Sequence, residues 1–345
     1  MLTKKIIFFS IDRLGDYLIR SNVIKKISNL YDHSEIICSE KNYKLIKNQS
    51  FFDKINLFDT NKKMFNKLLF LKNFFLKKYH TAIAFDGKSI SYILLFFMRA
   101  KNKHVFLYKK KGFLNYILLK TLLFTFYLFK INFIYLNSRN IIEDNNHDNY
   151  PKKYKNLEKF YPIKFDEEIY YLEKNDKSIF TNFKNEYILI HLDEKFKDII
   201  DINENLNEAL LNIKNNLNKK IFLTSFNNFF EYYNRLNLVK KKINEINHEV
   251  LLQSEILIIE DIPINDFQTL IENSYYNISC HSGYFVHTSL ALGKKTIDLI
   301  NQKDQIWLDT WVYKPKNYKI IFKSDETNLK KINEIFLEIA YEINK

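Results

Sequence analysis

The sequence has few of the residues that mark disulfide-bonded, metal-binding or loop-rich proteins. Its 345 residues include two cysteines, five glycines and four prolines. Cys38 and Cys280 supply neither a disulfide framework nor the spacing of metal ligands, so we expect a reducing, cytoplasmic setting. Ile6–Phe9 is too short for the apolar segment of a secretory signal, and we expect none.

A long apolar run is also missing. The longest candidate, Phe113–Phe129 (FLNYILLKTLLFTFYLF), is interrupted by Asn115 and Lys120. It falls short of the roughly 20 apolar residues of a spanning helix. We therefore expect a buried or surface-docking helix, and Lys109–Lys111 beside it could attract an anionic membrane surface.

The charge of the chain is strongly one-sided. The formal net charge is +13, and the hydrophobic fraction of 46% predicts a folded protein. Because lysine is abundant throughout, a solvated lysine-rich surface explains most of this charge. The sequence shows no RNA-binding aromatic motif, zinc finger or basic heptad, so no nucleic-acid partner is expected.

Short apolar runs alternate with helical spacing in both halves of the chain. This alternation predicts parallel sheets with helices on both faces. The predicted strands are 6–10, 35–39, 54–58, 81–85, 104–108, 187–191, 221–224, 256–259, 276–279 and 296–299. The predicted helices are 17–29, 62–77, 89–99, 203–217, 229–238, 266–273 (with Asn265 as N-cap), 287–292 and 329–343.

A polar stretch with two prolines separates the halves. We expect one Rossmann-like domain over residues 1–150, a linker over 151–180 and a second Rossmann-like domain over 181–345. The terminal helix could pack back on the first domain. Ligands of such sheets bind beyond the carboxyl ends of the strands.

Three of the five glycines follow strand ends, on the expected ligand side. Gly15, Gly87 and Gly283 each follow a predicted strand, whereas Gly293 is expected to end a helix. Asp12 and Asp16 flank the first of these turns. We expect a structural role for Asp12, and at the start of a helix Asp16 is favoured in its ionised form.

The stretch NISCHSGYFVHTSL carries the most chemistry in the second half. A helix opening after Gly283, with the Ser282 hydroxyl, would bind a diphosphate. His281 and His287 could donate hydrogen bonds to its oxygens, and Lys195, in a loop after a strand, could neutralise phosphate. A structural role for each histidine, and a plain surface role for Lys195, stay open.

Three stretches resemble the family 9 glycosyltransferases, the lipopolysaccharide heptosyltransferases. RLGDYLIRSNVIKKI (13–27) is similar to the family's RLGDVLLTTPVLRAL. The segment 77–108, with TAIAFDGKS, is similar to its second landmark. The segment 264–300, with NISCHSGYFVHTSLALGKKTIDLI, is similar to its C-terminal motif. The matches lie in the family's order, although His281 stands where the family has Asp.

The resemblance implies a GT-B fold: α/β, with two Rossmann-like domains whose parallel sheets face a central cleft. It implies a metal-independent, inverting sugar transfer with no cofactor besides the nucleotide-sugar substrate, which could be ADP-linked. Asp16 would be the general base. The phosphate-binding positions would be Lys195, His281, Ser282, Gly283 and His287. The cleft would be lined by Arg13, Gly15, Asp86, Gly87 and Lys88.

The function expected from this resemblance is extension of a lipid-linked surface glycan, such as lipopolysaccharide core. The first domain would bind the acceptor and the second the donor, in a monomer at the inner face of the cytoplasmic membrane. Two alternatives stay open. One is a sugar-nucleotide epimerase or hydrolase, and the other is a nonenzymatic glycan- or nucleic-acid-binding protein on a degenerate transferase scaffold.

Overall fold

The computed structural model describes residues 3–59, 61, 64–109, 113–137, 154–164, 170–173, 179–192, 206–224, 238–280, 283–323 and 332–345. The chain divides into two compact units. Unit 1 comprises Met1–Glu173 and Ile306–Tyr313, and unit 2 comprises Lys174–Gln305 and Lys314–Lys345. A short segment from the second half of the sequence therefore belongs to unit 1.

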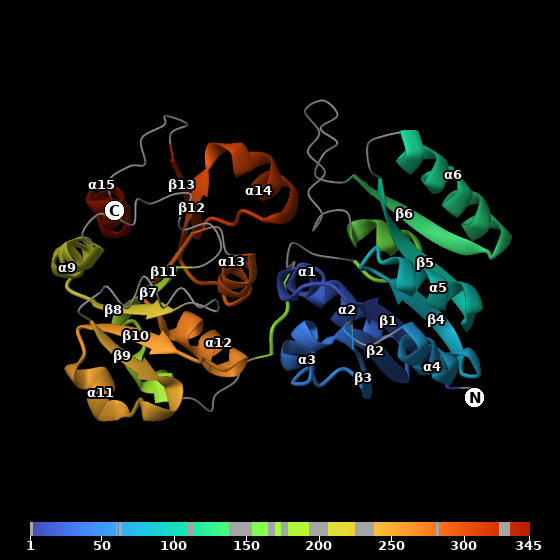
Figure 1. Ribbon diagram of the computed structural model, residues 1–345, viewed down its shortest axis with the longest axis horizontal. Coiled ribbons are helices and arrows are strands. Elements are labelled where there is room, and N and C mark those ends of the chain that lie inside the picture. Colours follow the sequence, from blue (N-terminus) through green and yellow to red (C-terminus); the bar gives the residue numbers. More distant parts are fainter. Residues whose placement is uncertain are drawn as a thin grey trace. The chain divides into compact units, whose positions relative to one another are not determined.

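Unit 1 contains a parallel sheet with the order β3-β2-β1-β4-β5-β6, six strands within the described residues (Figure 1). The strands are β1 (Lys5–Ser10), β2 (His33–Ser39), β3 (Lys54–Phe58), β4 (Lys78–Ala84), β5 (Arg99–Lys109) and β6 (Ile131–Asn137). The helices are α1 (Leu14–Leu18), α2 (Ser21–Ser28), α3 (Glu40–Ile46), α4 (Met64–Phe75), α5 (Ser89–Phe97) and α6 (Phe113–Leu128). A 3-10 helix, Tyr154–Lys159, follows.

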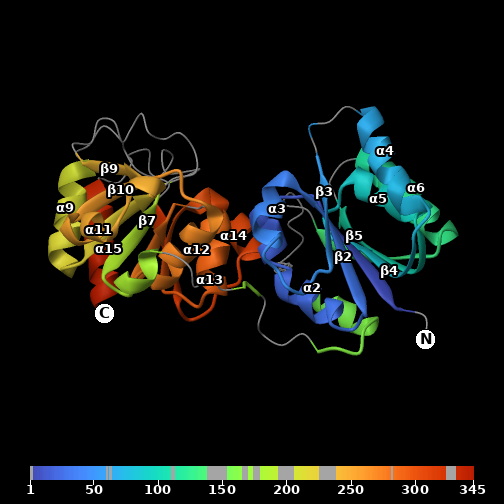
Figure 2. The same cartoon turned by 90° about the horizontal axis from the view of Figure 1, so that it is seen from below.

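The core of unit 1 lies on both faces of this sheet because successive side chains of a strand point to opposite sides. Ile7 and Phe9 of β1 share a buried cluster with Phe74 of α4, Leu95 of α5 and Phe126 of α6. Figure 2 shows α4, α5 and α6 on one side of the sheet, and α2 and α3 on the other. The two faces together form a doubly wound unit.

Unit 2 contains a second parallel sheet, with seven strands in its described part in the order β13-β12-β11-β7-β8-β10-β9. The strands are β7 (Tyr187–His191), β8 (Lys220–Thr224), β9 (Val239–Lys242), β10 (Ile256–Glu260), β11 (Tyr276–Ser279), β12 (Thr296–Asn301) and β13 (Tyr318–Lys323). The helices are α9 (Leu206–Leu217), α11 (His248–Gln253), α12 (Ile264–Asn273), α13 (Gly283–Ala291) and α15 (Ile332–Asn344). Helix α14 (Gln305–Trp311) follows β12 in the sequence, but from Ile306 on its residues belong to unit 1.

Helices α9 and α15 pack side by side on one face of the unit 2 sheet (Figure 1). Leu210 of α9 and Ile339 of α15 are fully buried in the same cluster as the strand residues Ile190 and Leu223. The terminal helix, for which the sequence left open a contact with the first domain, therefore packs within unit 2.

The predicted α/β class is confirmed, and most predicted strands lie within a residue or two of the observed ones. The single helix predicted over 17–29 is wrong, because α1 ends at Leu18 and α2 begins at Ser21. The Ser21 hydroxyl donates to the Leu18 carbonyl at 2.7 Å and so satisfies the end of α1. The buried side chain of Arg20 lies at this break.

Other helix predictions need correction or lie outside the described residues. Pro263, not Asn265, is the N-cap of α12, because proline fixes its own backbone for the turn that enters the helix. Helix α13 begins at Gly283 rather than His287. The predicted helix 229–238, apart from Leu238, lies outside the described residues. Among the helices in the described part of the chain, none is long and apolar enough to cross a bilayer.

Candidate active site

The sheet of unit 1 has its topological switch point between β1 and β4. The chain runs from β1 outward through β2 to β3, then returns to β4 on the other side of β1. Ligands of doubly wound sheets bind beyond the carboxyl ends of the strands at this point. The predicted residues Arg13, Gly15 and Asp16 follow β1, and Asp86, Gly87 and Lys88 follow β4. The fold thus brings the two groups to one edge of the sheet.

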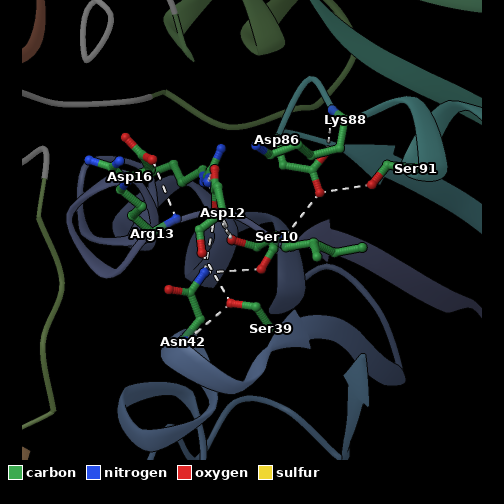
Figure 3. Close-up of polar contacts among 11 residues, drawn as sticks. Ser10, Asp12, Arg13, Asp16, Ser39, Asn42, Asp86, Lys88 and Ser91 are labelled. Atoms are coloured by element: carbon green, nitrogen blue, oxygen red, sulfur yellow. Dashed lines mark hydrogen bonds and ion pairs between the residues drawn. The ribbon is translucent and has the colours of Figure 1, made fainter. Parts of the chain in front are cut away.

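Asp86 ties together the two loops at this edge. Its Oδ2 accepts a hydrogen bond from the Ile11 backbone N–H at 2.9 Å and another from Ser91 Oγ at 2.8 Å. Its Oδ1 accepts from the Lys88 N–H at 3.0 Å (Figure 3). Asp86 is buried, and Gly87 beside it has a φ of +63°, which glycine adopts without strain. Three donors to one buried carboxylate make Asp86 a structural clamp between the β1 and β4 loops.

Asp12 forms a second buried network, on the other side of the β1 loop. Its carboxylate forms an ion pair with Arg20, which is fully buried, and accepts from Ser10 Oγ at 3.1 Å and Asn42 Nδ2 at 3.3 Å. Ser39 Oγ donates to the Asp12 carbonyl at 3.0 Å. Figure 3 shows these partners converging on Asp12 from β1, α3 and the end of β2. The network joins the β1 loop to the start of α3.

Asp16 lies in the first turn of α1, four residues after Asp12. It is partly buried, and its Oδ2 accepts from the Arg13 backbone N–H at 3.4 Å. The N-terminal turn of a helix favours a negatively charged side chain. Arg13 and Lys88 are exposed at the same edge, and Gly15 is partly exposed. The edge therefore presents one carboxylate and two cations on a backbone that buried hydrogen bonds hold in place.

The structural partners of the site were not predicted. Arg20, Ser39, Asn42 and Ser91 stand out neither by motif nor by spacing. One signal was available for Arg20: the chain has only five arginines against a large excess of lysine. A scarce arginine beside an acidic turn fits a buried ion pair better than a surface role, because its rigid guanidinium fork suits such pairing.

The corresponding switch point of unit 2 lies between β7 and β11. His191 ends β7 and pairs with Ser279, which ends β11, and α13 begins four residues after Ser279. Gly283 is the first residue of α13, and a Cβ built on it meets no described protein atom within 4 Å. Lys195, His281 and Ser282, also predicted here, lie outside the described residues. His287 lies on α13 with only 2% of its surface exposed.

The side chain of His191 packs against the first turn of α13. Its ring stacks on Phe285, with centroids 5.0 Å apart and planes 11° from parallel, and it also contacts Phe267 of α12. Its Nδ1 lies 2.9 Å from Thr224 Oγ1 at the end of β8. The carboxyl ends of β7 and β8 thus position the N-terminal turn of α13.

The two cysteines are free and buried. Burial raises the pKa of the Cys38 thiol to about 12 and also raises the pKa of Cys280. Both thiols are therefore protonated at neutral pH, and neither is a nucleophile or metal ligand in this state. Among the described residues, no group of three or more His, Cys, Asp and Glu side chains is arranged to hold a metal ion.

The fold has close counterparts among solved structures. A glycosyl transferase family 9 protein from Veillonella parvula superposes with a TM-score of 0.65 over 99% of this chain and 97% of its own, at 11% identity. The ADP-heptose lipopolysaccharide heptosyltransferase II of E. coli gives the same TM-score, coverage and identity. The chain has the fold of the family 9 glycosyltransferases. No protein-family model and no curated protein sequence matches it.

This GT-B fold also occurs with other chemistry. The UDP-GlcNAc 2-epimerase of Methanocaldococcus jannaschii superposes with a TM-score of 0.50 over 99% of this chain and 93% of its own, at 14% identity. The likeness to the two transferases is the greater one. The resemblance expected from three short motifs is confirmed at the level of the fold.

The Asp86 clamp can be tested by its contribution to stability. Hydrogen bonds to a charged group contribute about 1.5–3 kcal/mol each and are not additive. We expect Asp86→Ala to lower the free energy of unfolding by about 3 kcal/mol, and Ser91→Ala, which removes one of the three donors, by about 1–2 kcal/mol. Urea denaturation followed by circular dichroism measures both. A loss below about 1 kcal/mol for Asp86→Ala would contradict the clamp.

The Asp12–Arg20 pair makes a different prediction. Removing one partner of a buried ion pair costs about 3–5 kcal/mol, because the other charge stays buried and unpaired. We expect this loss for Asp12→Leu and for Arg20→Met. The double variant should be more stable than the sum of the two losses predicts, by at least about 1 kcal/mol. Additive losses in the double-mutant cycle would show that the two side chains do not depend on each other.

Proposed function

We propose that the protein is an inverting, metal-independent glycosyltransferase that moves a sugar, heptose or a related one, from a nucleotide-sugar to a lipid-linked surface glycan. The single observation that supports this most is the edge between β1 and β4. There a carboxylate on a helix N-terminus, Asp16, is carried by a loop that two buried networks hold. The greater likeness to two family 9 transferases than to an epimerase agrees with it.

In the proposed reaction Asp16 is the general base. It takes the proton from the acceptor hydroxyl as that oxygen attacks the anomeric carbon, and the bond from this carbon to the diphosphate breaks on the opposite side. The anomeric configuration is therefore inverted. The acceptor binds to the first predicted domain (1–150) and the donor to the second (181–345). Of the predicted linker 151–180, the part up to Glu173 belongs to unit 1.

The leaving diphosphate would be stabilised at the β7–β11 edge. The N-terminal backbone N–H groups of α13, which begins at Gly283, suit an anion by hydrogen bonding and by the helix dipole. Ser282, His281 and Lys195 would add donors and positive charge. His287, which is buried on α13, would donate a hydrogen bond to the diphosphate. Arg13, Gly15, Gly87 and Lys88 would line the acceptor side, with Asp86 holding it in place.

The proposed setting follows from the acceptor. A lipid-linked glycan such as lipopolysaccharide core places the enzyme in the cytoplasm, as a monomer in peripheral contact with the inner face of the cytoplasmic membrane. The donor would be an ADP-linked sugar, as in the name of the E. coli enzyme with the same fold.

The base assignment predicts a loss of turnover without a loss of stability. Asp16→Asn should lower kcat/KM by about 10²–10⁴-fold, the usual contribution of general base catalysis. Its free energy of unfolding should change by less than about 1 kcal/mol, because the isosteric amide keeps an oxygen that can accept from Arg13. Nucleoside diphosphate release in the presence of acceptor measures turnover.

Asp261→Asn, an equally isosteric change at an exposed carboxylate in unit 2, serves as the control and should keep full activity. Full activity in Asp16→Asn would contradict the proposed base. Acceptor-independent release of the nucleotide, or epimerised donor, at equal rates in both variants would instead favour the epimerase or hydrolase alternative.

The diphosphate site makes a separate prediction about two glycines. Gly283→Ala should fold normally, since its Cβ meets no described protein atom, but should weaken nucleotide binding at least tenfold by crowding the diphosphate. Gly293→Ala is the matched control: at φ +68° it should cost about 1 kcal/mol of stability and leave nucleotide affinity unchanged. Thermal shifts with ADP, UDP, GDP and CMP sugars measure both effects. Equal nucleotide-induced shifts in wild type and Gly283→Ala would exclude the site at α13.

A further inference from the structure

Helix α6 is apolar on the side that faces away from the sheet as well as on the side that packs on it. Its inner side contributes Leu119, Leu122, Leu123 and Phe126 to the unit 1 core. The exposed residues of its outer side are mostly apolar: Tyr116, Ile117, Leu118, Phe124, Tyr127 and Leu128, together with Lys120 and with Thr121, whose hydroxyl donates to the Ile117 carbonyl. A helix on the surface of a globular protein normally carries polar side chains on its outer side.

The side chains of this outer face are well exposed. Phe124 is 63% exposed and Tyr127 is 79% exposed, and Tyr116, Ile117 and Leu128 are also exposed. Phe97, at the end of α5, is 62% exposed, and its ring lies 5.7 Å from that of Phe75 on α4. The neighbouring Phe96 joins α5 to α6, because its ring lies 5.4 Å from Phe126 and 5.3 Å from Phe129. Contiguous apolar surfaces of this kind mark interaction sites.

The charge around α6 has one sign. Residues 87–142 contain ten lysines and arginines and no aspartate or glutamate. Lys109–Lys111 precede the helix, Lys130 follows it, and Lys120 lies in the middle of the outer face, with its Nζ 5.4 Å from the Tyr116 ring centroid. An anionic surface is the complement of this pattern.

The position of Lys120 decides between a protein and a lipid partner. Lysine is depleted from the buried centre of protein–protein interfaces. At a bilayer surface, by contrast, a lysine extends its charged end to the headgroups while its stem stays among apolar side chains. Tyrosine is likewise enriched at the membrane–water interface. With 16 residues, α6 is about 24 Å long, enough to lie along a bilayer surface.

We propose that the outer face of α6, with Lys120 on it and Lys130 beyond its end, binds the surface of an anionic phospholipid bilayer. Phe124 and Tyr127 insert among the acyl chains near the headgroups, and Lys120 and Lys130 contact lipid phosphates. Neither an apolar face nor a basic cluster alone gives stable anchoring, and α6 combines both. The inference deepens the membrane contact of the proposed function and rests on it for its setting. Its test uses lipid binding alone, so its failure would leave the transferase proposal standing.

Sedimentation of the full chain with vesicles tests the proposal. The wild type should bind vesicles of phosphatidylglycerol mixed with phosphatidylcholine, weakly bind phosphatidylcholine alone, and be released by salt. The pair Phe124→Ser and Tyr127→Ser should weaken binding at least about tenfold. The pair Lys120→Gln and Lys130→Gln should weaken it about 25-fold, since each lysine near an anionic surface contributes about fivefold.

Two control variants make the same chemical changes elsewhere. Leu252→Ser with Tyr341→Ser removes exposed apolar side chains of unit 2, and Lys44→Gln with Lys47→Gln removes exposed charges of α3. Both should bind vesicles as the wild type does, and all four variants should keep the wild-type circular dichroism spectrum.

Wild type that stays in the supernatant with anionic vesicles would overturn the proposal, and so would undiminished binding by the Phe124 and Tyr127 pair. A dimer in light scattering that this pair abolishes, without vesicle binding, would assign the face to a second copy of the chain and overturn it as well.

Discussion

Two buried carboxylates control the geometry of the candidate acceptor edge. Parallel strands end here in loops whose backbone groups have no partner in the sheet. Asp86 satisfies the Ile11 and Lys88 N–H groups, and Asp12 holds Ser10, Asn42 and Arg20. Burial makes each of these interactions costly to break, because a charge left without its partners would lie in a low-dielectric environment. The position of Asp16 follows from this, since its helix begins two residues after Asp12.

In unit 2, aromatic packing rather than buried charge fixes the segment that follows the strands. His191, at the end of β7, stacks on Phe285 in the first helical turns of α13 and contacts Phe267 of α12. The helix therefore begins at a fixed place over the carboxyl ends of β7 and β11. A rigid helix N-terminus suits the binding of a diphosphate, because its N–H groups are already oriented before the ligand arrives. The two units thus fit the two roles that we propose: a carboxylate on a fixed loop in unit 1 and oriented N–H donors in unit 2.

The sequence alone was sufficient to predict the strands and helices that a local hydrophobic pattern determines. Ile6–Phe9 is buried on both faces of a central parallel strand, so its apolar run is unambiguous. β9, which reads Val-Lys-Lys-Lys, was missed because it lies at the edge of its sheet, where β10 is its one partner among the described strands. The break between α1 and α2 was missed because it depends on Arg20 turning inward to Asp12, a contact that exists only after folding.

Within the candidate site, too, some features follow from the local sequence and others depend on the folded chain. The turn glycines and the acids near them could be found from the sequence because they come directly after predicted strands. Whether an acid holds two loops together or lies only partly buried at the edge of the sheet could not be predicted, because Asp86 and Asp16 both lie where a strand passes into the following helical segment. Asp86 is buried and accepts hydrogen bonds from Ile11 and Ser91, whereas Asp16 is only partly buried, and both facts depend on the folded chain.

A structure of the protein crystallised with a nucleoside diphosphate tests the central claim most directly, namely that the β7–β11 edge holds the donor and the β1–β4 edge presents the base. We predict that the diphosphate lies against the N-terminal turn of α13, beside Gly283, and that the β1–β4 edge is left for the acceptor. A nucleotide bound against Asp16 and the Asp86 loop, with α13 unoccupied, would contradict it.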